Sequence, residues 1–395
     1  MIEYKHCLRA ILTAIISIMF LPQSNAQEHD ALAYMDSVEF SLITCSPHEE
    51  IYSLYGHSAL RARDLHQARQ NDAVFNWGIF NFSKPFFVLR FVFGLTDYEL
   101  GVTGFQGFCD YYRHWGSSVT EQVLDLTPEE KLRLNYALEE NCQPANRVYR
   151  YNYFYDNCST RPRDIIERCI DGEVVYQPRE DYQPSYREMI HDKVDHHPWA
   201  RFGNDMLLGA KADVKTSRQE QEFLPENLLY DFDHAQIRSI DGTLRPLVKE
   251  RNMPVKPGVQ VVERGFPLTP TVCFLLLLLV SVVIFVCEWK RRMTFKYFDA
   301  ALMSVVGLAG CLLTVMLFSQ HPTTSTNLQV LLVNPIHLFY LPAVLKRRKT
   351  HYWTVLLAMV CLFFLGDFFQ HYAEGMSVLA LCLLLRFWIH QKNEK

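Results

Sequence analysis

The stretch YNYFYDNCSTRPRD, Tyr151 to Asp164, places Cys158 where an aromatic run gives way to the start of a helix. Ser159 and Thr160 are residue types that cap helices, a proline follows in the first turn, and the next apolar residues recur at helical spacing. Cys158 is therefore predicted at or just before a helix N-terminus. Because the positive end of the helix dipole favours a thiolate there, Cys158 is a candidate nucleophile.

A histidine that would activate this thiol occurs earlier, in YGHSALR, Tyr55 to Arg61. His57 within hydrogen-bond reach of Cys158 would take up the thiol proton. Both residues also have ordinary interpretations. A cysteine beside aromatic residues is usually a buried small apolar residue, or it forms a disulfide, here with Cys142 or Cys169, and a histidine in a strand is usually a satisfied core or surface residue.

The chain around these two residues predicts a mixed α+β domain. Three segments alternate in the manner of strands: DSVEFSLITCS (36–46), SALRARD (58–64) and AVFNWGIFNF (73–82). LTPEEKLRLNYALEENC (126–142) predicts a helix, because a threonine cap, a proline and two glutamates open it. From Gly172 onward helices and loops alternate, and the Pro-rich residues 244–270 predict an arm leading to the next domain.

The N-terminus predicts export from the cytoplasm. Lys5 and Arg9 precede the apolar run Ala10 to Leu21, and Ser24-Asn25-Ala26 resembles a small-residue cleavage site, so residues 1–26 are predicted to be a signal peptide. The chain has 395 residues and a net charge of -4, which gives no polyanion-binding signature. Nucleic acid is therefore excluded as an expected partner.

The C-terminal part predicts a multi-pass membrane domain. Apolar segments near the ~20 residues that cross a bilayer lie at 271–287, 298–318, 328–345, 352–369 and 376–389. The connecting sequences KRRMTFK and KRRK and the C-terminal tail are basic, whereas SQHPTTSTN and QHYAEG contain no Lys or Arg. The positive-inside rule then predicts five spans with a cytoplasmic C-terminus and the preceding domain outside. The predicted domains are 1–26, 27–267 and 268–395.

The exported domain contains an odd number of cysteines: Cys45, Cys109, Cys142, Cys158 and Cys169. They cannot all pair within one chain, so at least one thiol is free unless a bond to another chain forms, and all of them could be reduced. The histidines of HDKVDHH (191–197) lack the Cys or Glu residues that would complete a metal site, so we predict neither a metal nor a cofactor.

Several motifs together carry a family resemblance: YGHSALR, FNWGIFNF, YNYFYDNCSTRPRDII, LLGAKAD and FLPENL. They resemble the periplasmic domain of the Lnb-type lipoprotein N-acyltransferases, and the apolar part is similar to the five-helix membrane domain of that family. The resemblance covers essentially the whole mature chain. It implies a permuted papain-like exported domain, related to NlpC/P60 and lecithin:retinol acyltransferase-like folds, with a helical extension, followed by an all-α transmembrane bundle.

The resemblance also implies roles for residues of this chain. Cys158 would be the nucleophile and His57 the general base. The third, orienting residue is expected to be Asn76, with Asp72 as the second choice, and His66 in its loop-like stretch has little weight. We predict four residues in contact with substrate: Asn157 and Arg161 beside the thiol, and Asn334 and His337 in the third apolar segment, where polar residues are costly.

The implied reaction is acyl transfer in two halves. The thiolate attacks an ester of a membrane phospholipid, the donor, and the resulting thioester acylates the α-amino group of a lipoprotein's diacylglyceryl-cysteine, the acceptor. Backbone N–H groups near Cys158 would form the oxyanion hole. The implied location is the inner membrane with the N-terminal domain in the periplasm. Two other functions stay open: a papain-like peptidase or amidase acting on cell-wall peptides, and a non-catalytic membrane chaperone in which Cys158 forms a disulfide.

Overall fold

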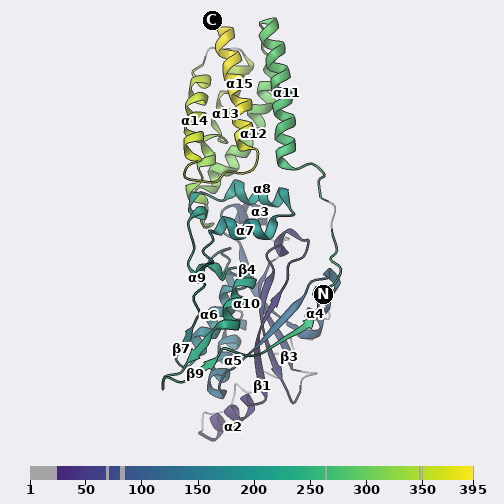
Figure 1. Ribbon diagram of the computed structural model, residues 1–395, viewed down its shortest axis with the longest axis vertical. Coiled ribbons are helices and arrows are strands. Elements are labelled where there is room, and N and C mark those ends of the chain that lie inside the picture. The colour runs from purple at the N-terminus through teal and green to yellow at the C-terminus, as the bar shows by residue number, and fades with distance from the viewer. Residues whose placement is uncertain are drawn as a thin grey trace. The chain divides into compact units, whose positions relative to one another are not determined.

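The structure is a computed structural model and describes residues 25–67, 71–80, 85–262, 265–346, 348 and 350–394. The predicted signal peptide lies outside the described residues, apart from Asn25 and Ala26. The chain forms two compact units, each assembled from separate stretches of sequence (Figure 1). Unit 1 comprises Met1–Lys84, Thr96–Asp181 and Ser217–Glu263, and unit 2 comprises Pro85–Leu95, Tyr182–Thr216 and Arg264–Lys395.

Unit 1 is built on an antiparallel sheet of seven strands in the order β10-β5-β1-β2-β3-β4-β6. The strands are β1 (Val38–Cys45), β2 (His57–Asp64), β3 (Asp72–Ile79), β4 (Asp97–Gly104), β5 (Val119–Leu124), β6 (Val148–Arg150) and β10 (Val248–Val255). The three segments predicted from alternation are β1, β2 and β3, so that prediction is confirmed. They pair consecutively, which places the start of β2 beside the end of β1.

Both faces of this sheet are covered, because alternate residues of β1 enter different hydrophobic clusters. Phe40 and Leu42 join the larger cluster, which includes residues of helices α5 (Pro128–Cys142), α6 (Thr160–Cys169) and α10 (Pro225–His234). Ile43 and Cys45 join a smaller cluster with residues of α4 (Phe105–Trp115). The other helices of unit 1 are α2 (Asn25–Met35), η1 (Ile51–Ser53) and α9 (Arg218–Gln221).

The two helices predicted from capping signals are present. α5 begins with a capping box, in which Thr127 accepts a hydrogen bond from the Glu130 N–H and the Glu130 carboxylate accepts one from the Thr127 N–H. α6 buries Ile165, Ile166 and Cys169 on one face, as the spacing predicts. This burial anchors the helix whose N-terminus carries Cys158.

The predicted arm over residues 244–270 is wrong for its first half. Leu244–Pro246 forms β9 of a small sheet with β7 (Glu173–Val175) and β8 (Gln236–Arg238). Val248–Val255 is β10, which pairs with β5 at the edge of the main sheet. Most side chains of β10 are exposed, so the segment lacks the alternation of apolar and polar residues that would predict a strand.

Unit 2 combines the C-terminal helices with two stretches from earlier in the chain. Its elements are α3 (Phe87–Val92), α7 (Tyr186–Val194), α8 (Pro198–Leu207), η2 (Ala210–Asp213), α11 (Pro270–Arg291), α12 (Lys296–Met316), η3 (Thr324–Thr326), η4 (Leu328–Leu331), α13 (Ile336–Leu345), α14 (Tyr352–Gly366) and α15 (Met376–Glu394). The five predicted apolar segments coincide with α11 to α15, except that the third is divided into η4 and α13.

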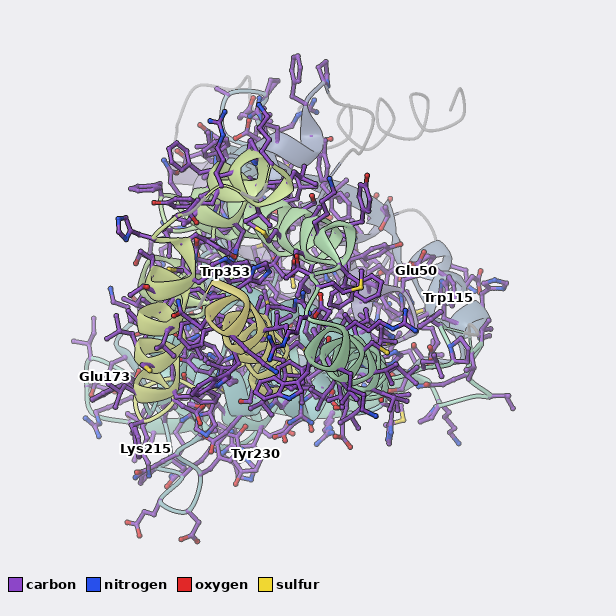
Figure 2. The ribbon with its side chains drawn as sticks, turned by 90° about the horizontal axis from the view of Figure 1, so that it is seen from above. Glu50, Trp115, Glu173, Lys215, Tyr230 and Trp353 are labelled. Carbon is purple, nitrogen blue, oxygen red and sulfur yellow. The ribbon has the colours of Figure 1, made fainter. Side chains whose placement is uncertain are left out.

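Three helical segments among the described residues are long and apolar enough to cross a membrane: Pro270–Arg291, Lys296–Met316 and Leu328–Leu345. Tyr352–Gly366 is apolar but shorter. α15 contains the buried Arg386, which binds Glu288 of α11 (2.5 Å) and Asp299 of α12 (2.6 Å). Trp353 of α14, which is labelled in Figure 2, stacks on His390 of α15 with ring centroids 3.8 Å apart. Because three of the five predicted segments are long and apolar enough to cross a membrane, the number of five spans stays a prediction.

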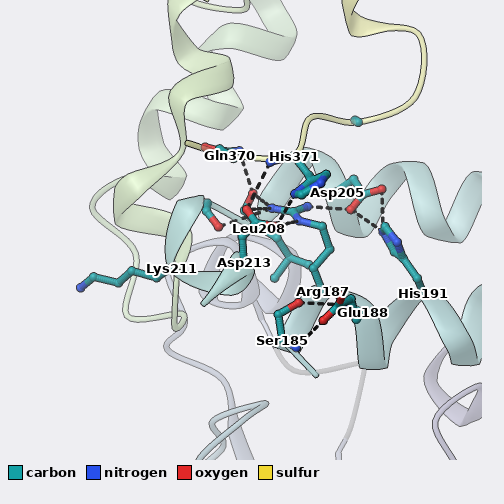
Figure 3. A network of polar contacts seen from close by, with 12 residues as sticks. Ser185, Arg187, Glu188, His191, Asp205, Leu208, Lys211, Asp213, Gln370 and His371 are labelled. Carbon is teal, nitrogen blue, oxygen red and sulfur yellow. Dashed lines mark hydrogen bonds and ion pairs between the residues drawn. The ribbon is translucent and has the colours of Figure 1, made fainter. Parts of the chain in front are cut away.

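A buried polar network joins α7, α8 and η2 to the loops between the C-terminal helices (Figure 3). Arg187 of α7 binds Asp205 and Asp213 at 2.6 Å each. Gln370, which precedes α15, donates to the Leu208 carbonyl at 3.1 Å, and its neighbour His371 lies 3.2 Å from Asp213. The loops predicted to lie outside the membrane thus pack with a segment of the predicted exported domain.

Candidate active site

Cys158 lies in the turn that enters α6, immediately before the N-cap residue Ser159. The buried side chain of Asn157 shapes this turn. Its Oδ1 accepts hydrogen bonds from the N–H groups of Ser159 (2.8 Å) and Thr160 (3.0 Å), and its Nδ2 donates to two backbone carbonyls (2.9 Å each). These bonds satisfy orphan donors of the helix start and fix where the thiol stands.

His57, the first residue of β2, is hydrogen-bonded to the Cys158 thiol. Burial alone would raise the pKa of Cys158, but the His57 charge and hydrogen bonds from His57, the Ser58 N–H and the Ser159 side chain together lower it below its ordinary 9.0. Burial would lower the pKa of His57, yet the charge and hydrogen bond of Cys158 and the contact with Asn76 raise it. Both directions favour a thiolate–imidazolium pair.

Asn76 of β3 holds the other side of the imidazole. Its Oδ1 lies 2.5 Å from the Nε2 atom of His57. Strand pairing accounts for this contact: β2 and β3 are antiparallel with Leu60 opposite Phe75. Continuing that register sets His57 opposite Gly78, so Asn76 is its diagonal neighbour on the same face of the sheet.

The structure thus brings together Cys158, His57 and Asn76, the three residues that the sequence suggested for catalysis. The order is histidine on a strand, orienting amide on the next strand, and cysteine at a helix start. A thiol activated by a histidine that a third group orients is the arrangement used for nucleophilic attack on a carbonyl carbon.

Comparison with protein families gives two matches along the chain. The Lnb N-terminal periplasmic domain matches residues 26–190, and the Lnb transmembrane domain matches residues 262–394. The chain belongs to the Lnb family. Comparison with curated proteins and with solved structures gave no match. The family indicates a membrane protein with a periplasmic N-terminal domain and a role like that of a lipoprotein N-acyltransferase.

Gly78 is a residue of the Lnb periplasmic domain that sequence reasoning missed. Its φ of +97° lies in the region that favours glycine. A Cβ atom at this position would lie 3.8 Å from the Cβ of Cys158, so the glycine faces the thiol across from His57. A glycine within a strand is a signal for close approach of another chain segment, and the motif FNWGIFNF contains that signal.

Ser58 and Ser159 also contribute more than the sequence indicated. Ser58 directly follows His57, and Ser159 directly follows Cys158. The Oγ atoms of the two serines lie 3.0 Å apart in the core. The Ser58 backbone and the Ser159 side chain both hydrogen-bond the Cys158 sulfur. The two serines therefore tie the start of β2 to the start of α6 and stabilise the thiolate.

The two side chains near the thiol that were predicted to contact substrate, Asn157 and Arg161, already bind other groups of the protein. Every polar atom of the Asn157 amide is bonded to the backbone, so the structure gives this side chain a positioning role. Arg161 pairs with Asp156 through both carboxylate oxygens (2.5 and 2.7 Å) and lies over the ring of Tyr149. An anionic group of a substrate would have to exchange with Asp156 to reach this guanidinium.

Asp72, the second choice for the orienting residue, binds an arginine and does not contact His57. It pairs with Arg61 through both carboxylate oxygens at 2.7 Å, and Arg61 also binds Glu121. His66 follows the end of β2, where its N–H donates to Asp64. Neither residue takes the place beside His57 that Asn76 occupies.

The two predicted contacts in the Lnb transmembrane domain are satisfied by their own surroundings. Asn334 accepts a hydrogen bond from the N–H of Ile336, the first residue of α13 (3.1 Å), and donates one to the Val330 carbonyl (3.0 Å). His337 is fully buried between the Tyr352 hydroxyl (2.8 Å) and the Leu332 carbonyl (2.9 Å). These bonds account for polar residues in an apolar segment without a substrate.

The cysteines that the structure describes are free thiols, Cys142, Cys158 and Cys169 among them. Cys158 thus forms neither of the disulfides considered from the sequence. Burial raises the pKa of Cys142 to about 11, and it also raises the pKa of Cys169. Cys158 differs from both in the direction of its pKa shift, because only its surroundings supply a histidine.

Proposed function

We propose that this protein is an N-acyltransferase that moves an acyl chain from a membrane phospholipid to the α-amino group of a lipoprotein's diacylglyceryl-cysteine. The observation that carries the proposal is the position of His57, hydrogen-bonded to Cys158 on one side and to Asn76 at 2.5 Å on the other. The Lnb family matches support the substrate class, since the family indicates a lipoprotein N-acyltransferase-like role.

In the first half-reaction, the Cys158 thiolate attacks the ester carbonyl carbon of the phospholipid. The tetrahedral intermediate collapses, the ester C–O bond breaks, and the imidazolium of His57 gives its proton to the leaving alkoxide. The products are a lysophospholipid and a thioester on Cys158. The directions of both pKa shifts favour the charged pair, in which the nucleophile and the acid are both in the forms that this step needs.

In the second half-reaction, the lipoprotein amine attacks the thioester and His57 accepts the proton that the amine loses. The C–S bond breaks, an amide forms, and the thiolate returns. An amide is more stable than a thioester, so this half runs downhill. The other N–H groups of the turn, those of Asn157, Ser159 and Thr160, are engaged, so we assign the oxyanion to the N–H of Cys158 itself.

The proposal includes a location and a fold relationship. We place the protein in the inner membrane with five spans and a cytoplasmic C-terminus. The packing of 182–216 against Gln370 and His371 supports this orientation, because both segments were independently predicted to lie outside (Figure 3). We also propose that unit 1 is a permuted papain-like domain, which the order of histidine strand before cysteine helix supports.

The test is mass spectrometry of the N-terminal lipopeptide of a reporter lipoprotein, in a host that lacks its own N-acyltransferase. The intact protein should add a third acyl chain, and Cys158→Ala should not. Cys142→Ala is the matched control, because it removes a free thiol whose pKa is raised rather than lowered. A diacylated lipopeptide with intact, membrane-inserted protein would refute the proposal, and fatty acid release without lipopeptide acylation would favour a hydrolase.

A further inference from the structure

Helix α3 leaves the main sheet between β3 and β4 and belongs to unit 2. It is held against the loop that follows α12. The Gln320 N–H donates to the Phe93 carbonyl (3.0 Å), and Nε2 of His321 lies 2.5 Å from the Phe91 carbonyl. The ring of His321 also packs on that of Phe91 with centroids 5.2 Å apart.

Gly94, which follows α3, shows how closely the chain packs against the loop after α12. Gly94 has a φ of +68°, and a Cβ atom there would lie 2.8 Å from the backbone nitrogen of His321. Only glycine combines this backbone angle with this contact. α3 is therefore docked against the loop, which fixes its level relative to α12.

The loop that holds α3 directly follows the end of a candidate membrane span, α12. α12 ends at Met316, and Phe318, just beyond it, is 80% exposed. The loop residues that hold α3 follow within a few positions. If α12 spans the membrane, a phenyl ring so exposed at its end is expected to meet lipid, and this would set α3 beside the boundary of the hydrocarbon layer.

The free face of α3 is apolar. Phe86, the N-cap residue, is 77% exposed and Leu89 is 54% exposed, whereas Phe91 packs on His321. Phe86 has a φ of +56°, a left-handed conformation that is unusual for a bulky residue. Strained backbone that presents an exposed aromatic ring is typical of a contact surface rather than of a solvated loop.

We propose that α3 is an interfacial helix that inserts Phe86 and Leu89 into the outer leaflet of the bilayer. The occupant that we assign to this face is the lipid surface itself, because α3 is docked against the loop that directly follows the candidate span α12. Arg90 is exposed on the same helix and donates to the Leu95 carbonyl (3.0 Å), a place suited to headgroup phosphates. The proposal does not depend on the acyltransferase function.

The position of α3 in the chain gives this insertion a consequence. β3, which carries Asn76, precedes α3, and β4 begins at Asp97, two residues after Leu95. An inserted α3 would therefore hold the stretch of chain between these two strands at the bilayer surface.

Photocrosslinking tests this inference in the full-length protein reconstituted into vesicles of phosphatidylethanolamine and phosphatidylglycerol with radiolabelled acyl chains. Benzoylphenylalanine replaces Phe86 or Leu89 in separate samples. Leu279 in α11, 59% exposed, is the reference for lipid contact, and Ile240 in unit 1, 86% exposed, is the matched exposed residue outside the proposed surface.

The expected result is lipid label at position 86 or 89 that exceeds the label at 240 at least fivefold and approaches that at 279. Label at both positions no higher than at 240, in a sample that labels at 279, would overturn the proposal. Crosslinks from 86 and 89 to a protein in native membranes, without lipid label, would equally overturn it and assign the face to a protein partner.

Discussion

The Nε2 atom of His57 lies 2.5 Å from Oδ1 of Asn76, and this contact determines which ring nitrogen serves the thiol. An amide oxygen only accepts hydrogen bonds, so Nε2 must carry a proton. In the proposed mechanism, Nδ1 is then the nitrogen that exchanges a proton with Cys158. We therefore expect Asn76 to act on the reaction by orienting His57 and fixing its tautomer.

Replacing this amide should lower the rate without altering substrate binding. Asn76→Ala removes one hydrogen bond that holds the imidazole, worth about 1–3 kcal/mol, or roughly five- to 150-fold in kcat. Asn76→Asp keeps an acceptor and adds a negative charge that raises the pKa of His57, so activity should largely return and extend to higher pH. Steady-state kinetics over a pH series measures both effects. An unchanged kcat in Asn76→Ala would remove the orienting role.

The reactivity of Cys158 should show its lowered pKa. Alkylation by iodoacetamide requires the thiolate, so the rate for Cys158 should reach half its maximum below pH 9.0, its ordinary value. In His57→Ala the histidine's charge and hydrogen bond are lost while burial remains, so the pKa should rise and the midpoint should move to higher pH.

Peptide mass spectrometry isolates this thiol from the others, and Cys158→Ala provides the background. Cys142, whose pKa is raised to about 11, is the internal reference because it should label slowly in both proteins. A midpoint that is the same with and without His57 would contradict the thiolate–imidazolium pair.

Much of unit 1 could be predicted from the sequence, because its central elements follow local rules. β1, β2 and β3 alternate in polarity, and α5 and α6 carry their own start signals. The edge strand β10 could not be found this way, since most of its side chains are exposed and it joins the sheet through backbone pairing with β5. Pairing of that kind leaves no pattern in the side chains.

The candidate site likewise contains residues that the sequence predicted and residues whose role only the structure shows. Cys158, His57 and Asn76 could be named because each is a residue type suited to the chemistry and lies in a motif of the family resemblance. The positioning role of Asn157 could not be seen, because it depends on backbone groups that only the folded turn brings to the amide. The membership of Tyr182–Thr216 in unit 2 likewise could not be seen, because it involves contacts between residues far apart in the chain, such as that of Leu208 with Gln370.

Gly78 should tolerate no side chain. Gly78→Ala places a Cβ in a left-handed conformation, which costs about 1–2 kcal/mol, and brings it against Cys158, so both stability and activity should fall. Gly107→Ala is the control, because that glycine lies within α4 with open space around it, and alanine should stabilise the helix by about 1 kcal/mol. Thermal unfolding and the lipopeptide assay measure the two effects. Equal activity of the two variants would show that the space beside Cys158 is not used.

Arg187 should be essential to the stability of unit 2. Its guanidinium is buried between Asp205 and Asp213, so Arg187→Ala removes the arginine that both carboxylates bind and leaves Asp205 with His191 and Asp213 with His371 (Figure 3). Removing one member of a buried ion pair costs about 3–5 kcal/mol. Arg238→Ala is the matched control, because Arg238 pairs with Glu173 at an exposed site, where an ion pair is worth about 0–1 kcal/mol. Calorimetry of the detergent-solubilised protein should show a lower transition temperature for Arg187→Ala and an unchanged one for Arg238→Ala. If the Arg187 variant unfolded at the temperature of the intact protein, the network could not be what binds α7 and η2 to the loop before α15.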